Sequence, residues 1–139
     1  MSCIGMKRFF IHISGLIILA PVLHAQEGPP MLLYGNFKQM GLQQATVSQL
    51  LEVPRFTVLK EGCAVKGFEV SGVVPGKQMI GPYISETDSL TDAQYRYINS
   101  LEKEGHVWFH HIQVDCKDGN TYILGKDNTE FSIYFFTID

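Results

Sequence analysis

Residues 106–122, HVWFHHIQVDCKDGNTY, gather side chains that could do chemistry within one short stretch. The stretch holds three histidines, a tryptophan, two aspartates and a cysteine. Imidazole, thiolate and carboxylate groups are ligands of transition metals, imidazole with carboxylate is a common acid–base pair, and tryptophan anchors interfaces. Which of these roles is open depends on whether the secondary structure brings the side chains together.

The element predicted here is a β-strand from Val107 to Cys116, followed by a hairpin signal, KDGN, at residues 117–120. In a regular strand His106 and His110 share a face but lie about 13 Å apart, while His110 and His111 point to opposite faces. Ligands of one zinc ion must all come within about 2.0–2.3 Å of it. A regular strand therefore cannot build a metal site from these histidines alone.

An irregular strand is the alternative. Phe109 and Ile112 are its two best core candidates, yet they have opposite parity, so burying both requires a β-bulge near His110 and His111. Such a bulge could bring the two imidazoles to one side of the sheet. The neighbouring sequence still offers no HExxH, no CxxC and no convergent third ligand. The sequence therefore predicts no metal site and no cofactor.

Catalytic signatures are absent from the sequence as well. No GxSxG nucleophile elbow occurs, and Cys116 would have to remain a free thiolate in a compartment that favours its oxidation. His111 with Asp115 or Glu104 could pair as acid and base in the fold. We expect no catalytic residue and a chain that is not an enzyme. A small hydrolase or ligand-binding protein, with its site near His110 and His111, is the alternative.

Recognition is the task that the aromatic residues favour. Trp and Tyr anchor interfaces because they combine a large apolar area with a polar group. Trp108, His110 and His111 are expected at exposed or half-buried positions of the strand, and Tyr95 on the outer side of a predicted helix. These four are the predicted interaction residues.

The N-terminus has the layout of a secretory signal peptide spanning residues 1–25. Lys7 and Arg8 precede an apolar run of about 15 residues that ends near the small residue Ala25, whereas a spanning helix needs about 20. An uncleaved anchor is the minority alternative. We expect the mature chain to be periplasmic or extracellular and to have no membrane span.

Charge and cysteine content fit that compartment. Loss of Lys7 and Arg8 makes the formal net charge of −3 more negative, which disfavours nucleic acid and anionic lipid as partners. Cys63 and Cys116 remain, an even number of cysteines where disulfides persist. We expect them to form a disulfide, with two buried thiols as the alternative.

After a flexible segment at residues 26–45, residues 46–139 are predicted to form one β-rich domain, with a short helix or turn at 45–53. Strands are expected within residues 55–77 and over 107–116, 121–124 and 131–138. In the stretch GFEVSG, Phe68 and Val70 should face the core, and Glu69 and Ser71 the solvent.

One helix signal begins at Thr91, whose capping box with Gln94 starts a helix that runs toward Gly105. Its predicted buried side consists of Ala93, Tyr97, Ile98 and Leu101. The predicted fold class is mainly β (α+β): a small antiparallel β-sandwich-like domain with one helix on the sheet.

Two segments, ATVSQLLEVPRFTVLKEGCAVKGFEVSGVVPGK and INSLEKEGHVWFHHIQVDCKDGNTYIL, with the final apolar strand, resemble the C-terminal domain of the gliding-motility protein GldM and its secretion counterpart PorM. In that domain an S-x-L segment precedes an F-x-V strand, a glycine precedes an F-x-x-I strand, and a D-G hairpin leads to the last strand. The matching residues here are Ser48, Leu50, Phe68, Val70, Gly105, Phe109, Ile112, Asp118 and Gly119. The resemblance covers residues 46–136 and rests on turns and core residues, without a catalytic signature.

The resemblance implies a periplasmic β-rich domain of a Bacteroidetes-type bacterium, related to the shaft of the type IX secretion and gliding machine. That shaft protein sits in the inner membrane and has several periplasmic domains, whereas this chain is expected to have a signal peptide and one domain. We therefore expect a non-enzymatic interaction or structural module of the cell envelope whose partners are secretion or gliding components. The sequence leaves its oligomeric state open.

Overall fold

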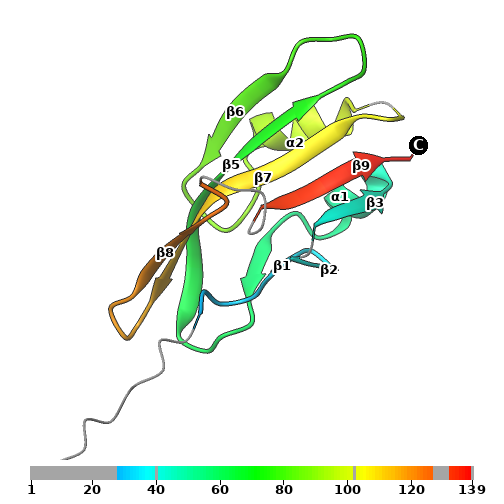
Figure 1. Ribbon diagram of the computed structural model, residues 1–139. Helices are drawn as coiled ribbons and strands as arrows, with labels where there is room; N and C mark the ends of the chain where they lie inside the picture. Colours follow the sequence, from blue (N-terminus) through cyan, green and yellow to red (C-terminus); the bar gives the residue numbers. More distant parts are fainter. Residues whose placement is uncertain (1–27, 40, 102, 127–131, 139) are drawn as a thin grey trace, which may run out of the picture.

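The computed structural model describes residues 28–39, 41–101, 103–126 and 132–138, which fold into two β-sheets and two helices (Figure 1). The fold is mainly β with helices added, as predicted. The predicted signal peptide, residues 1–25, lies outside the described residues. No helix within the described ranges is long and apolar enough to cross a membrane.

The larger sheet has six strands and is built around two long ones, β5 (Cys63–Val73) and β7 (His106–Cys116). The strand order is β3 (Leu42–Ala45), β9 (Ile133–Thr137), β7, β5 and β6 (Ile80–Ser85), with β8 (Thr121–Leu124) beside β7. One half of β7 pairs with β9 and the other half with β8, and the β7–β8 hairpin forms at the predicted turn. The sheet is mixed rather than purely antiparallel, because β3 pairs in parallel with β9.

The smaller sheet corrects one prediction, because its first strands lie inside residues 26–45, which were expected to be flexible. It has the order β2 (Phe37–Lys38), β1 (Leu32–Tyr34) and β4 (Phe56–Val58). Leu32 and Tyr34 are fully buried, and the Tyr34 hydroxyl donates a hydrogen bond to the Leu50 carbonyl oxygen at 2.9 Å. Core packing therefore orders β1, and the described part of the domain includes residues before 46.

The helices are α1 (Val47–Glu52) and α2 (Asp92–Asn99), each of which begins with a capping box. The capping box of Thr91 with Gln94 confirms the predicted start of α2, but the helix ends at Asn99, short of Gly105. Tyr97, Ile98 and Leu101 are buried as expected.

One detail of the helix prediction was wrong. Ala93 is exposed, and Gln94 is buried in its place because its amide donates a hydrogen bond to the Tyr83 carbonyl oxygen at 2.8 Å. The second helix, α1, lies where the sequence allowed either a helix or a turn.

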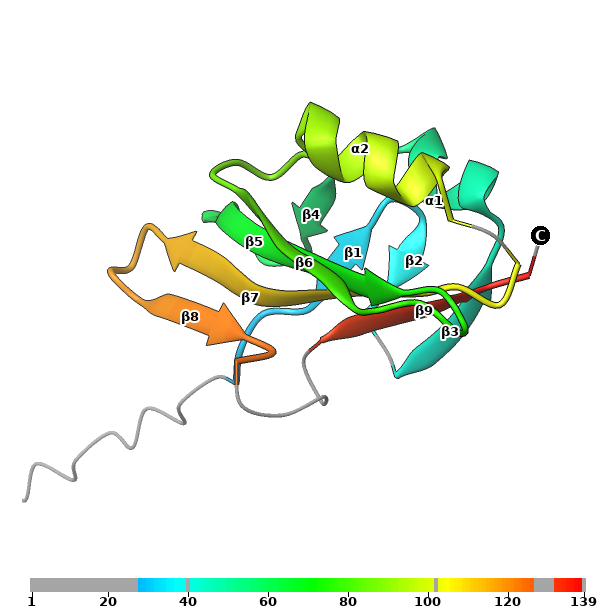
Figure 2. The ribbon, with the colours of Figure 1, turned by 90° about the horizontal axis from the view of Figure 1, so that it is seen from above.

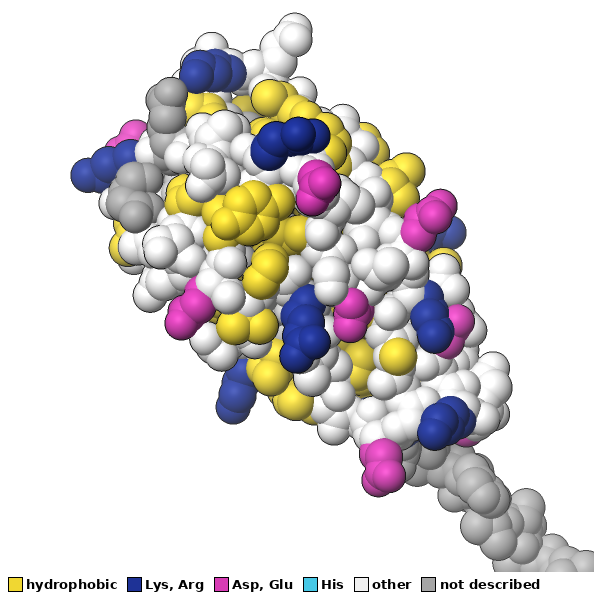
Figure 3. Space-filling model, turned by 180° about the vertical axis from the view of Figure 1, so that it is seen from behind, with side chains coloured by type: hydrophobic (Ala, Val, Ile, Leu, Met, Phe, Trp, Pro, Cys, Tyr) yellow, Lys and Arg dark blue, Asp and Glu magenta, His cyan; other side chains and the backbone are white. Residues whose placement is uncertain are grey.

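The helices and the smaller sheet lie on the same side of the six-stranded sheet, which we call the covered face (Figure 2). Its core is aromatic: the Tyr34 ring lies 4.2 Å from Phe109 and 6.1 Å from Phe135, measured between centroids. Figure 3 views the molecule from behind the sheet and shows apolar patches interspersed with Lys, Arg and acidic side chains. The histidines of the described residues are not visible on that side.

Cys63 and Cys116 form the predicted disulfide, with Cα atoms 4.0 Å apart. They are direct partners in the β5–β7 pairing. The bond therefore joins the two central strands at one end of their pairing. Both cysteines are partly buried against the core.

Candidate functional site

The β5–β7 pairing contains the β-bulge that the sequence raised as an alternative. Gly67 pairs with Gln113 and Glu69 with His110, so His111 and Ile112 together lie opposite Phe68. His111 has a φ of 47°, in the left-handed region, while Phe109 and Ile112 are both fully buried despite their opposite parity. The bulge thus keeps the core continuous and leaves both imidazoles on the other side of the sheet.

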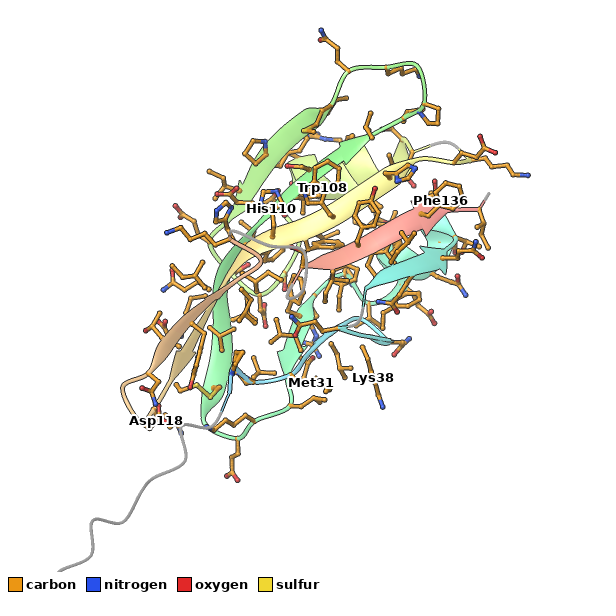
Figure 4. The ribbon with its side chains drawn as sticks, in the orientation of Figure 1. Met31, Lys38, Trp108, His110, Asp118 and Phe136 are labelled. Carbon is orange, nitrogen blue, oxygen red and sulfur yellow. A yellow bond between two sulfur atoms is a disulfide. The ribbon has the colours of Figure 1, made fainter. Side chains whose placement is uncertain are left out.

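That other side, which we call the open face, carries the side chains that alternate with the core residues. No helix or strand of the described residues covers it (Figure 2). It consists of Glu69 and Ser71 from β5; His106, Trp108, His110 and His111 from β7; and Tyr134 and Phe136 from β9. Figure 4 shows Trp108, His110 and Phe136 along its length.

Two imidazole rings and one carboxylate of the open face lie close together at the bulge. The Nδ1 atoms of His110 and His111 lie 3.0 Å apart. Oε2 of Glu69 lies 3.4 Å from the first and 3.1 Å from the second. Together the three residues form a cluster whose ligand atoms all lie within 4.8 Å of one another, which we call the His–His–Glu cluster.

Ser71 holds one member of this cluster in place. Its Oγ lies 2.8 Å from Nε2 of His110, and Ser71 is only 4% exposed. Burial lowers the pKa of His110 below its ordinary value; the charge of Glu69 opposes this shift and His111 adds to it. The neutral imidazole is therefore favoured at His110.

A row of neighbouring rings, packed edge-to-face or tilted, runs along the open face from β9 across β7 and ends at His110 of the cluster. Successive centroids are 5.0 Å apart for Phe136 and His106, 5.6 Å for His106 and Tyr134, 5.8 Å for Tyr134 and Trp108, and 6.3 Å for Trp108 and His110. His106 also hydrogen-bonds to the Tyr134 hydroxyl, whose pKa is raised by burial. We call these five residues the ring row.

A pocket of about 230 Å³ opens beside the bulge. Glu69 and His111 are among the residues that line it, with Lys66, Ile84 and Glu86. The lining therefore combines charged side chains with the exposed apolar side chain of Ile84.

The structure brings together three of the four predicted interaction residues. Trp108, His110 and His111 all lie on the open face, whereas Tyr95 lies on α2, which packs on the covered face. Tyr95 is exposed as predicted but belongs to a different surface.

The carboxylate partners that the sequence suggested for His111 were wrong. Glu69, and not Asp115 or Glu104, faces His111; the Asp115 carboxylate instead accepts hydrogen bonds from Gln113 and Thr121. The sequence predicted that Glu69 and Ser71 face the solvent. Both lie on that side of their strand, but Ser71 is buried and hydrogen-bonded to His110. Only the β5–β7 register links the two residues to the histidines.

No protein-family model matches the chain, and a search of curated proteins found no significantly similar sequence. The resemblance to the GldM C-terminal domain therefore stays a prediction.

Proposed function

We propose that this chain is a non-enzymatic interaction module that binds a protein partner through its open face. The observation that supports this proposal is the ring row, in which aromatic and imidazole rings lie side by side on a sheet face without a covering layer in the described residues. Such rings supply large contact areas at low cost in side-chain entropy, and aromatic residues dominate the binding energy of many interfaces.

Docking on the face is favoured over strand addition at an edge. One outermost strand, β6, contains Pro82, which has no N–H to donate to an added strand. The other edge strands of this sheet, β3 and β8, have only four residues each. None of these edges offers a long row of backbone groups to an added strand, whereas the ring row spans β9 and β7.

The proposed compartment is the periplasm or the cell exterior, because disulfides persist after export and the chain contains one. The proposed partner is a cell-envelope protein. Its best candidates are components of the type IX secretion or gliding machinery, and this part of the proposal rests on the sequence resemblance alone.

A second candidate function is a small hydrolase or ligand-binding protein with its site near His110 and His111. The pocket beside His111 and Glu69 is the observation that favours it. The two candidates differ in the residues on which they depend: partner docking requires Trp108, whereas small-ligand binding requires Glu69 and His111.

The experiment is mild crosslinking of the tagged chain in its own cells, followed by quantitative mass spectrometry of wild type, Trp108→Ser and Tyr95→Ser. Tyr95 is the matched control because it is an exposed aromatic residue on the opposite side. We expect specific envelope proteins to be recovered with wild type and Tyr95→Ser but reduced at least tenfold with Trp108→Ser. Equal recovery with all three would overturn docking through the open face.

A further inference from the structure

We propose that Glu69, His110 and His111 form a binding site for a divalent transition-metal ion, with Zn²⁺ as its simplest probe. This inference goes beyond the interaction function and does not depend on it. It rests on how three ligand atoms from two strands converge at one β-bulge.

The spacing of the three atoms matches one triangular face of a metal coordination shell. Ligands placed about 2.0–2.1 Å from an ion lie about 2.8–3.4 Å from one another, depending on whether the geometry is octahedral or tetrahedral. The distances here are 3.0 Å between the two Nδ1 atoms and 3.1 and 3.4 Å from these atoms to Oε2 of Glu69. A single ion can therefore contact all three atoms with little movement of the side chains.

Protons alone cannot satisfy this triangle. A carboxylate only accepts hydrogen bonds, and each Nδ1 is either a donor or an acceptor. A hydrogen on only one Nδ1 leaves the lone pair of the other nitrogen facing that of Glu69, and hydrogens on both leave two N–H groups facing each other across 3.0 Å. A cation at the centre of the triangle is attracted to all three lone pairs at once.

A contact of His110 with Ser71 favours the tautomer in which the Nδ1 lone pair of His110 is free to bind an ion. Its Nε2 lies 2.8 Å from Oγ of Ser71, which is almost fully buried. When Nε2–H donates to that oxygen, Nδ1 carries no hydrogen and points toward Glu69 and His111. A hydrogen bond from the second ring nitrogen is the usual way in which proteins orient a metal-binding histidine.

The backbone supplies the remaining orientation. His111 has a backbone φ of 47°, a left-handed conformation that costs free energy for any residue other than glycine. This conformation in the bulge places the His111 ring beside that of His110. Glu69 is the direct strand partner of His110, so the regular pairing of β5 with β7 fixes the third ligand.

Two imidazoles and one carboxylate are the ligand set of several catalytic zinc sites and of mononuclear iron sites, in which other coordination positions stay open. His111 and Glu69 border the pocket, so an ion held by the cluster would have open positions next to that space. Water, or a donor group from a bound molecule, could occupy them. The local sequence lacked a third ligand; the structure supplies it from a strand about 40 residues earlier in the chain.

The test is calorimetric titration of the chelator-treated full chain, without a histidine tag, with Zn²⁺ alone. We expect one ion per chain with micromolar or tighter affinity. Glu69→Gln, which removes the charge and keeps the shape, should weaken binding at least tenfold. His111→Asn should do the same, because asparagine tolerates the left-handed backbone but removes the imidazole.

His106→Gln is the matched control, since His106 lies on the same face but outside the cluster. Its zinc affinity should equal that of wild type, and at the same zinc concentration the rise in Tm should be equal for these two proteins and smaller for Glu69→Gln. Circular dichroism of each variant checks the fold. Absence of saturable one-to-one binding by wild type, or equal affinity of Glu69→Gln and His106→Gln, would overturn the proposal.

Discussion

The two faces of strands β5 and β7 are made by alternating residues of the same strands, yet they differ in residue type and in burial. On the covered face, Phe68 and Phe109 pack against each other and against Phe56. On the open face, Glu69 and Trp108 occupy the neighbouring positions and remain partly accessible. The core determines which residues occupy the covered face, whereas the open face tolerates polar rings because no layer of the described residues packs on it.

The bulge is where the two faces depend on each other. Burial of both Phe109 and Ile112 forces the irregularity, and the irregularity groups His110 and His111 on the open face. A requirement of packing on one side therefore produces the histidine pair on the other.

The largest expected effect compares Phe109→Ala with Trp108→Ala. Phe109 is fully buried, so its truncation should lower the free energy of unfolding by about 3–5 kcal/mol. Trp108 is half-buried, and its truncation should cost no more than about 1.5 kcal/mol. Denaturant unfolding measures both values. Similar losses for the two variants would erase the distinction between the faces.

Reduction of the disulfide should have the next largest effect. Cys63 and Cys116 are 53 residues apart, and closing a loop of that size contributes up to about 4 kcal/mol through the entropy of the unfolded chain. We expect Cys63→Ser with Cys116→Ser to lose about 2–4 kcal/mol in thermal or denaturant unfolding. A double variant as stable as wild type would show that this bond adds nothing to the packing of the covered face.

Gly72→Ala probes the contact between β5 and α2 on the covered face. A Cβ atom at residue 72 would overlap the Tyr97 hydroxyl and lie 2.6 Å from the His106 carbonyl oxygen. We expect a loss of about 1–3 kcal/mol from overpacking. Gly28→Ala is the control, because a Cβ there meets no atom within 4 Å. Equal stability of the two variants would mean that α2 does not press on the strand.

The smallest effect concerns His110 in metal-free protein. Burial holds its pKa below the ordinary value of 6.5, and the charge of Glu69 partly opposes this. The unfolded chain binds the proton more readily, so this group's contribution to stability is present above about pH 6.5 and is lost as the pH falls toward the folded-state pKa. NMR titration should place the pKa below 6.5 and lower still in Glu69→Gln. A pKa above 6.5 would contradict the burial of this ring.

The sequence predicted the long strands and the β7–β8 hairpin because their alternation and turn residues are local signals. The β1–β2 hairpin was missed although Gly35-Asn36 is a turn signal. Its two strands are very short, and the burial of Leu32 and Tyr34 in the core, which a local pattern does not show, stabilises them. Gln94 was missed as a core residue because its amide depends on a carbonyl group of another strand.

For the candidate site, too, local sequence signals predicted some features, whereas those that depend on strand pairing could not be predicted. The parity of Phe109 and Ile112 indicated the bulge, and the residue types indicated that Trp108 and the histidines would be accessible. Glu69 could not be assigned to them, since strand pairing across about 40 residues leaves no trace in the local sequence. Tyr95 was grouped with the others by residue type alone, and the fold places it on the other side of the molecule.

We propose that the open face, and not the covered side, makes the functional contact. The most direct measurement is the crosslinking yield of envelope proteins with Trp108→Ser relative to Tyr95→Ser, each normalised to wild type. We predict a yield reduced at least tenfold for Trp108→Ser and unchanged for Tyr95→Ser, with both variants folded by circular dichroism. A reduced yield for Tyr95→Ser with an unchanged yield for Trp108→Ser would place the contact on the helix side and contradict the account.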